Sequence, residues 1–216
     1  MSPAPAATPT LPEPLGLTYT CGAGLPFDAA AFDGPIGAEL EDHPSAAAIR
    51  DLPPFYETSE LQPPWRLAAR TDVEALYLRG DRPVWYARLE QKAGAWTLTG
   101  WGDCAGWLVS GEDMPVTWWL ADADSLGPDS LHVPILAATL CEAGPLAGRL
   151  QPPRIVYRET DVLVALMARR PEPTAEYCSE PEVLATDIGL DEPLEGRALL
   201  DASVWPPRDP RSPPGS

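Results

Sequence analysis

The sequence has few of the residues and motifs on which enzyme chemistry and nucleotide binding usually rest. Only two of its 216 residues are histidines, His43 and His132, and it contains neither a G-x-G-x-x-G nor a G-x-x-x-x-G-K-[ST] motif. A G-x-S-x-G nucleophile motif is also missing, because the nearest stretch, 108–111, lacks the first glycine. We therefore predict no catalytic residues, and a hydrolase that uses one of the two histidines is kept as an alternative.

Basic residues and long apolar runs are scarce as well. Fifteen lysines and arginines face 32 aspartates and glutamates, which gives a formal net charge of −17. Such a surface repels phosphate backbones, so nucleic acid is not expected as a partner. No run approaches 18 apolar residues, so no membrane span is expected, and the first residues do not read as a signal peptide.

Metal and cofactor motifs are weak. The four cysteines form no C-x-x-C pair, which argues against a zinc site. The stretch 122–133 resembles the start of a calcium loop, but Leu126 and Val133 occupy the fifth and twelfth positions, where oxygen ligands are needed. We predict no metal site and no cofactor, and we interpret the many acidic pairs as a solvated face.

Proline is abundant, with 28 residues. Since proline fixes φ and removes a backbone donor, the chain should consist of short elements joined by fixed loops. Residues 1–16 are rich in proline, alanine and threonine and are predicted to be a disordered tether, and residues 208–216 a disordered tail.

Alternation of apolar and polar residues is clearest between Trp65 and Trp107. It predicts strands at 65–70, 73–79, 84–89 and 95–101, joined by tight turns as an antiparallel meander. Within the last of these strands, alternation places Trp96 and Leu98 on one face and Trp101 on the other. Short helices at 35–40 and 44–52 would cover one face of the sheet, which makes residues 17–115 an α+β unit.

The second half of the chain is predicted to be a small β-sandwich over residues 116–207, after a linker at 108–115. Pro134 lies inside one of its strands and suggests an edge strand or a bulge. The expected strands are 116–120, 131–141, 154–157, 161–169, 183–188 and 198–204. The fold class is therefore α+β and mostly β.

An even number of well-spaced cysteines fits two disulfides, for which three pairings exist. We favour Cys21–Cys104 and Cys141–Cys178, because each pair stays within one predicted half of the chain. Disulfides indicate an oxidising compartment. The alternative is four reduced thiols in a cytosolic protein.

Tryptophans on the meander are interpreted mainly as core residues, because aromatic side chains bury large areas. The adjacent pair Trp118-Trp119 must point to opposite faces of a strand, so one of the two should lie outside the core or between the halves. With Arg154, this pair is our candidate for a binding surface.

Several segments together resemble a group of uncharacterised exported or lipid-anchored proteins of high-GC bacteria. The resemblance rests on GWGDC (100–104), residues 131–141, GRLQPPRIVY (148–157), a cysteine at 178 and EPLEGRALLD (192–201), and it covers roughly residues 17–207. It implies export and disulfides, but it implies no activity.

The expected function is a non-catalytic binding or scaffolding protein of the cell envelope or the extracellular space, acting on an unknown protein or envelope ligand. A hydrolase and a cytosolic protein-interaction module are the alternatives.

Overall fold

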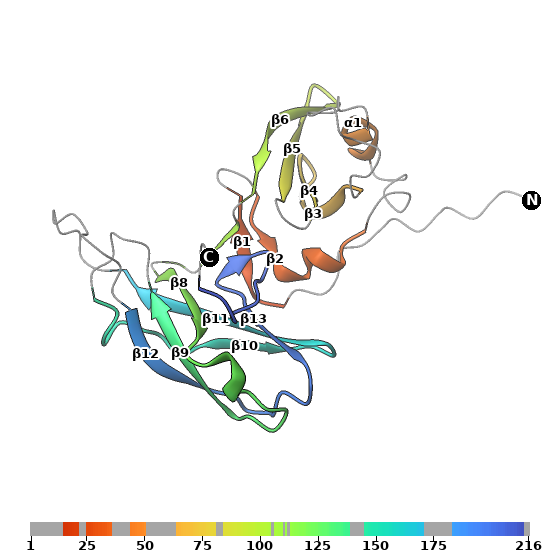
Figure 1. Ribbon diagram of the computed structural model, residues 1–216. Helices are drawn as coiled ribbons and strands as arrows, with labels where there is room; N and C mark the ends of the chain where they lie inside the picture. Colours follow the sequence, from red (N-terminus) through yellow and green to blue (C-terminus); the bar gives the residue numbers. More distant parts are fainter. Residues whose placement is uncertain are drawn as a thin grey trace, which may run out of the picture. The chain divides into compact units, whose positions relative to one another are not determined.

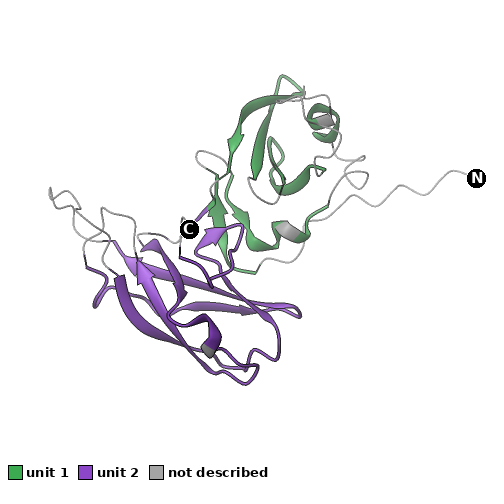
Figure 2. Ribbon diagram, in the orientation of Figure 1, with its two compact units in different colours: residues 1–106 green, residues 107–216 purple. Residues whose placement is uncertain are grey.

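The computed structural model describes residues 15–21, 25–35, 44–50, 64–80, 84–104, 106–109, 111, 113–138, 145–170 and 183–213. The chain divides into two compact units, residues 1–106 and 107–216 (Figure 2). The predicted linker at 108–115 contains the end of one strand, β7 (Gly106–Leu108), and the start of another, β8 (Asp113–Leu120).

Unit 1 contains the predicted antiparallel meander, with strand order β3-β4-β5-β6 (Figure 1). Its strands are β3 (Arg66–Arg70), β4 (Glu74–Arg79), β5 (Trp85–Lys92) and β6 (Ala95–Asp103). The turn between β5 and β6 consists of Ala93 and Gly94, both with positive φ (52° and 82°). Two such residues suit the tight hairpin turns that match the twist of the strands.

The predicted helical cover forms as α1 (Ala46–Arg50), which lies beside β5 and β6 (Figure 1). Its Ala46 and Ile49 join a core cluster with Leu67, Ala75, Tyr77, Ala87 and Leu89. These strand residues share one face of the sheet, as the alternation predicted. Most of the other predicted helix, residues 36–40, lies outside the described residues.

The opposite face of β3 and β4 is also covered. Leu76 and Leu78 point away from the α1 side and are fully buried. The short strands β1 (Thr18–Thr20) and β2 (Phe27–Asp28) pair antiparallel, and the 3-10 helix η1 (Ala29–Asp33) follows them. β2 and η1 contact β3, and the backbone N–H of Leu67 donates to the carbonyl of Pro35 at 3.1 Å. The second face of the sheet is therefore buried at β3 and β4, whereas Thr97 and Thr99 of β6 are exposed.

Unit 2 is the predicted β-sandwich. Its main sheet runs β10-β11-β8-β9-β12, and β13 pairs in parallel with β11. Its remaining elements are η4 (Ala123–Ser125), β9 (His132–Ala138), β10 (Arg154–Tyr157), β11 (Asp161–Arg169), β12 (Val183–Gly189), β13 (Ala198–Asp201) and β14 (Val204–Trp205).

Strand β11 is the centre of unit 2. Its first half is flanked by β10 and β13, and its second half pairs with β8. Seven consecutive residues, 162–168, are buried, so both of its faces are covered. One face packs against apolar side chains of β8, β9, β12 and β13, including Val116, Trp118, Ile135, Ile188 and Leu199.

Pro134 does not mark an edge strand or a bulge, so that prediction is wrong. β9 lies between β8 and β12, and Pro134 is paired with Asp187 in a regular ladder. The ladder to β8 ends at Ile135, while the carbonyl of Pro134 accepts from Ala121 at 3.0 Å. The N–H that proline lacks would thus fall just beyond the last ladder pair, where its loss costs little.

The predicted disordered tail at 208–216 needs correction, because residues 208–213 are held against unit 2. Arg208 forms a β-bridge with Asp201, and the backbone N–H of Leu120 donates to Pro210 at 2.9 Å. The Arg208 guanidinium donates to buried Asp201 (Nε–Oδ2 3.0 Å) and to the carbonyls of Trp118 and Ser212. Composition gave no sign of this anchoring, because it depends on the burial of one carboxylate, that of Asp201, seven positions before Arg208.

Candidate functional site

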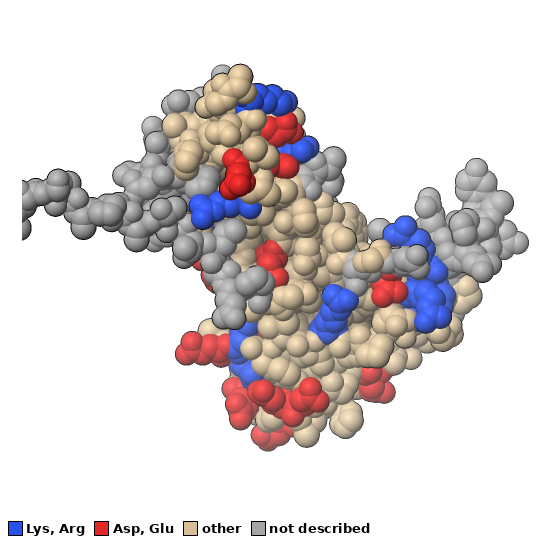
Figure 3. Space-filling view, turned by 180° about the vertical axis from the view of Figure 1, so that it is seen from behind, with Lys and Arg blue, Asp and Glu red and all other residues tan. Residues whose placement is uncertain are grey.

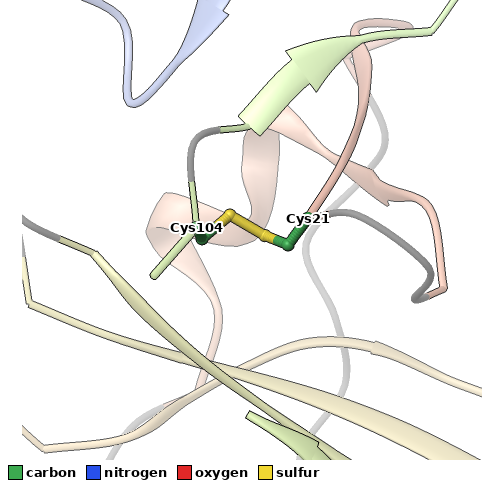
Figure 4. The surroundings of a disulfide bond; sticks show 2 residues. All are labelled: Cys21 and Cys104. Atoms are coloured by element: carbon green, nitrogen blue, oxygen red, sulfur yellow. A yellow bond between two sulfur atoms is a disulfide. The ribbon is translucent and has the colours of Figure 1, made fainter. Parts of the chain in front are cut away.

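The first of the two predicted disulfides, Cys21–Cys104, is present in unit 1 (Figure 4). Cys21 follows β1 and Cys104 follows β6, and both side chains are buried. The backbone N–H of Cys104 also donates to Val84 just before β5, at 2.7 Å. The disulfide therefore fixes the end of the sheet where β5 begins and β6 ends. Cys141 and Cys178 lie outside the described residues.

Four side chains form a row across the meander at this same end. Arg79 of β4 is opposite Trp85 of β5, and Trp85 is opposite Asp103 of β6. Directly opposed residues of antiparallel strands share a face and have neighbouring Cβ atoms. On the β3 side, the Arg79 guanidinium lies 5.5 Å from the ring centroid of Trp65. The row thus reads Trp65, Arg79, Trp85, Asp103.

Trp101 lies in the next row, on the same face as these side chains, because of a β-bulge. The β5–β6 register shifts between Arg88 and Leu89, so Leu89 is opposite Leu98 whereas Ala87 is opposite Trp101. Leu89 and Ala87 share a face, so the extra residue brings Trp101 to the same face as Leu98, contrary to the predicted alternation. Glycine in a strand is a recognised sign of a bulge, and Gly100 was the available signal.

Trp101 stacks against Trp85, with ring centroids 6.4 Å apart and ring planes inclined by 21°. Its side chain is 46% exposed, whereas Trp65 and Trp85 are half-buried. We call the set Trp65, Arg79, Trp85, Trp101 and Asp103 the tryptophan platform. Leu67, Tyr77 and Ala87 in the next row are buried in the core, so the platform is continuous with rigid structure.

The back of the platform is supported by Tyr86. A Cβ added to Gly102 would lie 3.5 Å from the Tyr86 ring, and one added to Gly100 would lie 3.8 Å from it. The ring therefore lies against the backbone on both sides of Trp101. An aromatic side chain over cross-strand glycines is a known way to stiffen a strand pair that lacks Cβ atoms.

Charge on the platform is mixed. Asp103 is exposed, and burial lowers the pKa of the Arg79 guanidinium from its ordinary value, although not enough to remove its charge at neutral pH. The platform therefore offers hydrogen-bond donors from Arg79, acceptors from Asp103, and aromatic surface between them.

The binding surface expected from sequence is not assembled. Trp118 is fully buried in the core of unit 2, and its indole N–H donates to the carbonyl of Val164 at 3.2 Å, so of the two tryptophans Trp118 is the one that lies inside. Trp119 points to the other face of β8 and is half-buried, as strand geometry requires. Arg154 is exposed on β10, and β11 separates it from β8. Strand geometry required one of the two tryptophans to lie outside the core, but it could not tell which one.

The other residues considered for chemistry are dispersed. His132 is exposed at the start of β9, opposite Gly189, while His43 lies outside the described residues. Asp122, at the start of the suspected calcium loop, caps η4 by accepting the N–H of Asp124 at 3.1 Å. Within the described ranges, no three histidine, cysteine or acidic residues are grouped closely enough to hold a metal ion.

Unit 2 contains a cavity of about 280 Å³. Its walls are mainly apolar, with Arg197, Asp209 and Arg211 as charged groups. The Arg197 guanidinium donates to the carbonyls of Leu194 (3.1 Å) and Pro193 (2.6 Å) and to Glu192 (3.1 Å), and it covers the ring of Tyr157. Because this arginine holds its own turn together, the cavity is less suited to a polar ligand than the platform.

One end of the strands in unit 2 is rich in acidic side chains, and Figure 3 shows acidic side chains gathered at the lower end of its view with basic side chains beside them. The loops after β8 and β12 carry the exposed acidic residues Asp122, Asp124, Asp129, Asp191, Glu192 and Glu195. At the opposite strand ends, Arg149 donates to the carbonyl of Arg169 at 2.8 Å, next to exposed Arg170. On the platform, by contrast, one basic residue, Arg79, and one acidic residue, Asp103, lie on either side of Trp85.

Among the described residues, no helix is long and apolar enough to cross a membrane. Comparisons with known proteins give no further guide, because no family model, no curated protein and no solved structure matches this chain. The function must therefore be argued from the platform itself.

Proposed function

We propose that this protein is a non-catalytic binding or scaffolding protein of the cell envelope or extracellular space, and that it binds its ligand through the tryptophan platform. The observation that carries the proposal is the bulge that brings Trp101, which is 46% exposed, to the same face as Trp85 and stacks the two rings. Bulges recur next to functional sites, where they re-aim one side chain.

Rigidity of the platform supports the same proposal. A ligand loses less affinity to ordering when the groups that meet it are already fixed. Here the Cys21–Cys104 disulfide, the buried row behind the platform and the Tyr86 ring all restrict the strands that carry the tryptophans.

The proposed compartment rests on the disulfide, since such bonds persist mainly in oxidising environments. We expect protein from its native host to resist alkylation at Cys21 and Cys104 until it is reduced. Rapid alkylation of both thiols without a reductant would instead place the protein in a reducing compartment.

Binding through the platform can be tested by co-sedimentation with envelope material from the native host. We expect saturable binding of the unmodified protein and at least tenfold weaker binding of Trp101→Ala. Trp107→Ala is the matched control, because Trp107 is also an exposed tryptophan (37%) but lies outside the platform. Equal binding by Trp101→Ala and the unmodified protein would refute the role of the platform.

A further inference from the structure

We infer that the ligand of the tryptophan platform is a saccharide chain; this inference rests on the proposed binding function and names its ligand class. Trp85 and Trp101 provide two near-parallel rings whose centroids are 6.4 Å apart. Small-ligand sites combine apolar or aromatic walls with a few polar groups that fix orientation. The C–H face of a sugar ring matches the first feature, and its hydroxyl groups match the second.

The polar groups of the platform distinguish a saccharide from other ligands that stack on tryptophan. Each sugar hydroxyl can donate one hydrogen bond and accept others, so the same ligand can donate to Asp103 and accept from Arg79. Asp103 is directly opposite Trp85, and Arg79 is directly opposite Trp85 on the other side. A donor and an acceptor therefore flank the Trp85 ring within one row, and Trp101 stacks on that ring from the next row.

A proline-rich peptide is the strongest competing ligand, because such peptides also dock on aromatic grooves. Proline has no backbone N–H, so a peptide of this kind offers carbonyl acceptors and no donor for the Asp103 carboxylate. Burying that carboxylate without a donor would cost free energy. Anionic polymers are disfavoured in turn by the net charge of −17.

The test is a titration of the full-length oxidised protein with three neutral hexasaccharides, chitohexaose, cellohexaose and maltohexaose, and with decaproline. Binding is followed by calorimetry. We expect at least one hexasaccharide to bind saturably, and we expect Trp101→Ala and Asp103→Ala each to weaken that binding about tenfold or more. Trp107→Ala should leave it unchanged, and thermal unfolding of each variant checks that the fold is retained.

The outcomes separate the saccharide inference from the binding function. Failure of all three hexasaccharides to bind, with decaproline binding that depends on Trp101, would overturn the saccharide inference and leave the binding function in place. Hexasaccharide binding that is insensitive to both Trp101→Ala and Asp103→Ala would overturn the inference as well. Both proposals would be overturned if the unmodified protein bound neither a hexasaccharide nor decaproline and if Trp101→Ala bound envelope material as well as the unmodified protein does.

Discussion

Asp201 is a fully buried carboxylate, and a buried charge needs hydrogen bonds and an opposite charge beside it. It accepts from Ser203 N–H (2.9 Å), from Arg208 (3.0 Å) and from Trp118 N–H (3.4 Å). Burial raises the pKa of Asp201, while the Ser203 hydrogen bond and the charge of Arg208 oppose the rise. The Asp201–Arg208 ion pair joins the C-terminal segment to β8 and β13, so its structural role is to order the end of the chain.

Arg208→Met should destabilise unit 2 by about 3–5 kcal/mol at neutral pH, because it leaves a buried carboxylate without its cation. An acid whose pKa is raised on folding favours the folded state at low pH, and that contribution is lost as pH rises through the folded-state pKa. Urea unfolding should therefore show a smaller deficit of the variant at pH 5 than at pH 7.

Two further variants control this prediction. Asp201→Asn combined with Arg208→Met should recover part of the loss, since no buried charge remains. Arg211→Met removes a surface ion pair with Asp209 (3.3 Å) and should change stability by less than about 1 kcal/mol. A deficit of Arg208→Met that does not change with pH would contradict the account of Asp201.

At the scale of elements, η1 is positioned by a close approach to β3. A Cβ added at Gly34, just after η1, would lie 2.6 Å from the Leu67 carbonyl oxygen and 3.1 Å from that of Ala31. Both neighbours are backbone atoms, so the alanine cannot be accommodated by a side-chain rotation. Gly34→Ala should cost about 1–3 kcal/mol of unfolding free energy, measured by chemical denaturation.

Gly127→Ala is the matched control for this substitution. Nothing lies within 4 Å of a Cβ built on Gly127, so the variant should be within about 0.5 kcal/mol of the unmodified protein. Equal stability of the two alanine variants would show that η1 does not dock tightly on β3.

The pairing of β9 with β12 gives the second predicted disulfide a physical basis. Val183 is opposite Ala138, so the segments leading to Cys141 and Cys178 start at neighbouring positions of the sheet. Cys141 is three positions after Ala138 and Cys178 is five positions before Val183, which is well within bonding reach at roughly 3.3–3.6 Å per residue. Peptide mapping without reduction should recover a Cys141–Cys178 linked pair. Recovery of both as alkylated free thiols would contradict it.

Periodicity predicted the secondary-structure elements well, but it did not predict which way Trp101 points or which second faces are buried. The meander and the strands of unit 2 follow from alternation, because one buried face fixes the register. The α1 cover follows instead from Pro44 and the apolar residues after it. The orientation of Trp101 does not follow from alternation, since one inserted residue reverses every later side chain. Leu76 and Leu78 are buried on the second face as well, and β2 and η1 contact the neighbouring strand β3, which alternation within β4 cannot reveal.

At the scale of the whole molecule, composition narrows the classes of partner, but it does not show where on the protein a partner would bind. The net charge of −17 and the scarcity of histidine argued against nucleic acid and against common hydrolases, and the disulfide agrees with an oxidising compartment. The platform could not be predicted, because its five residues come from three strands and the loop before β3, and they meet only through register. The opposite directions of neighbouring strand residues drew attention to Trp118 and Trp119, whereas exposure and rigidity single out Trp101.

Binding through the tryptophan platform can be tested with the indole N–H signals in a heteronuclear NMR spectrum, because they report on each tryptophan separately. Each of the eight tryptophans gives one such signal, which single substitutions assign. On addition of solubilised envelope fragments from the native host, the signals of Trp65, Trp85 and Trp101 should shift together, while those of Trp107 and Trp118 stay in place. Shifts confined to tryptophans outside the platform would contradict the claim.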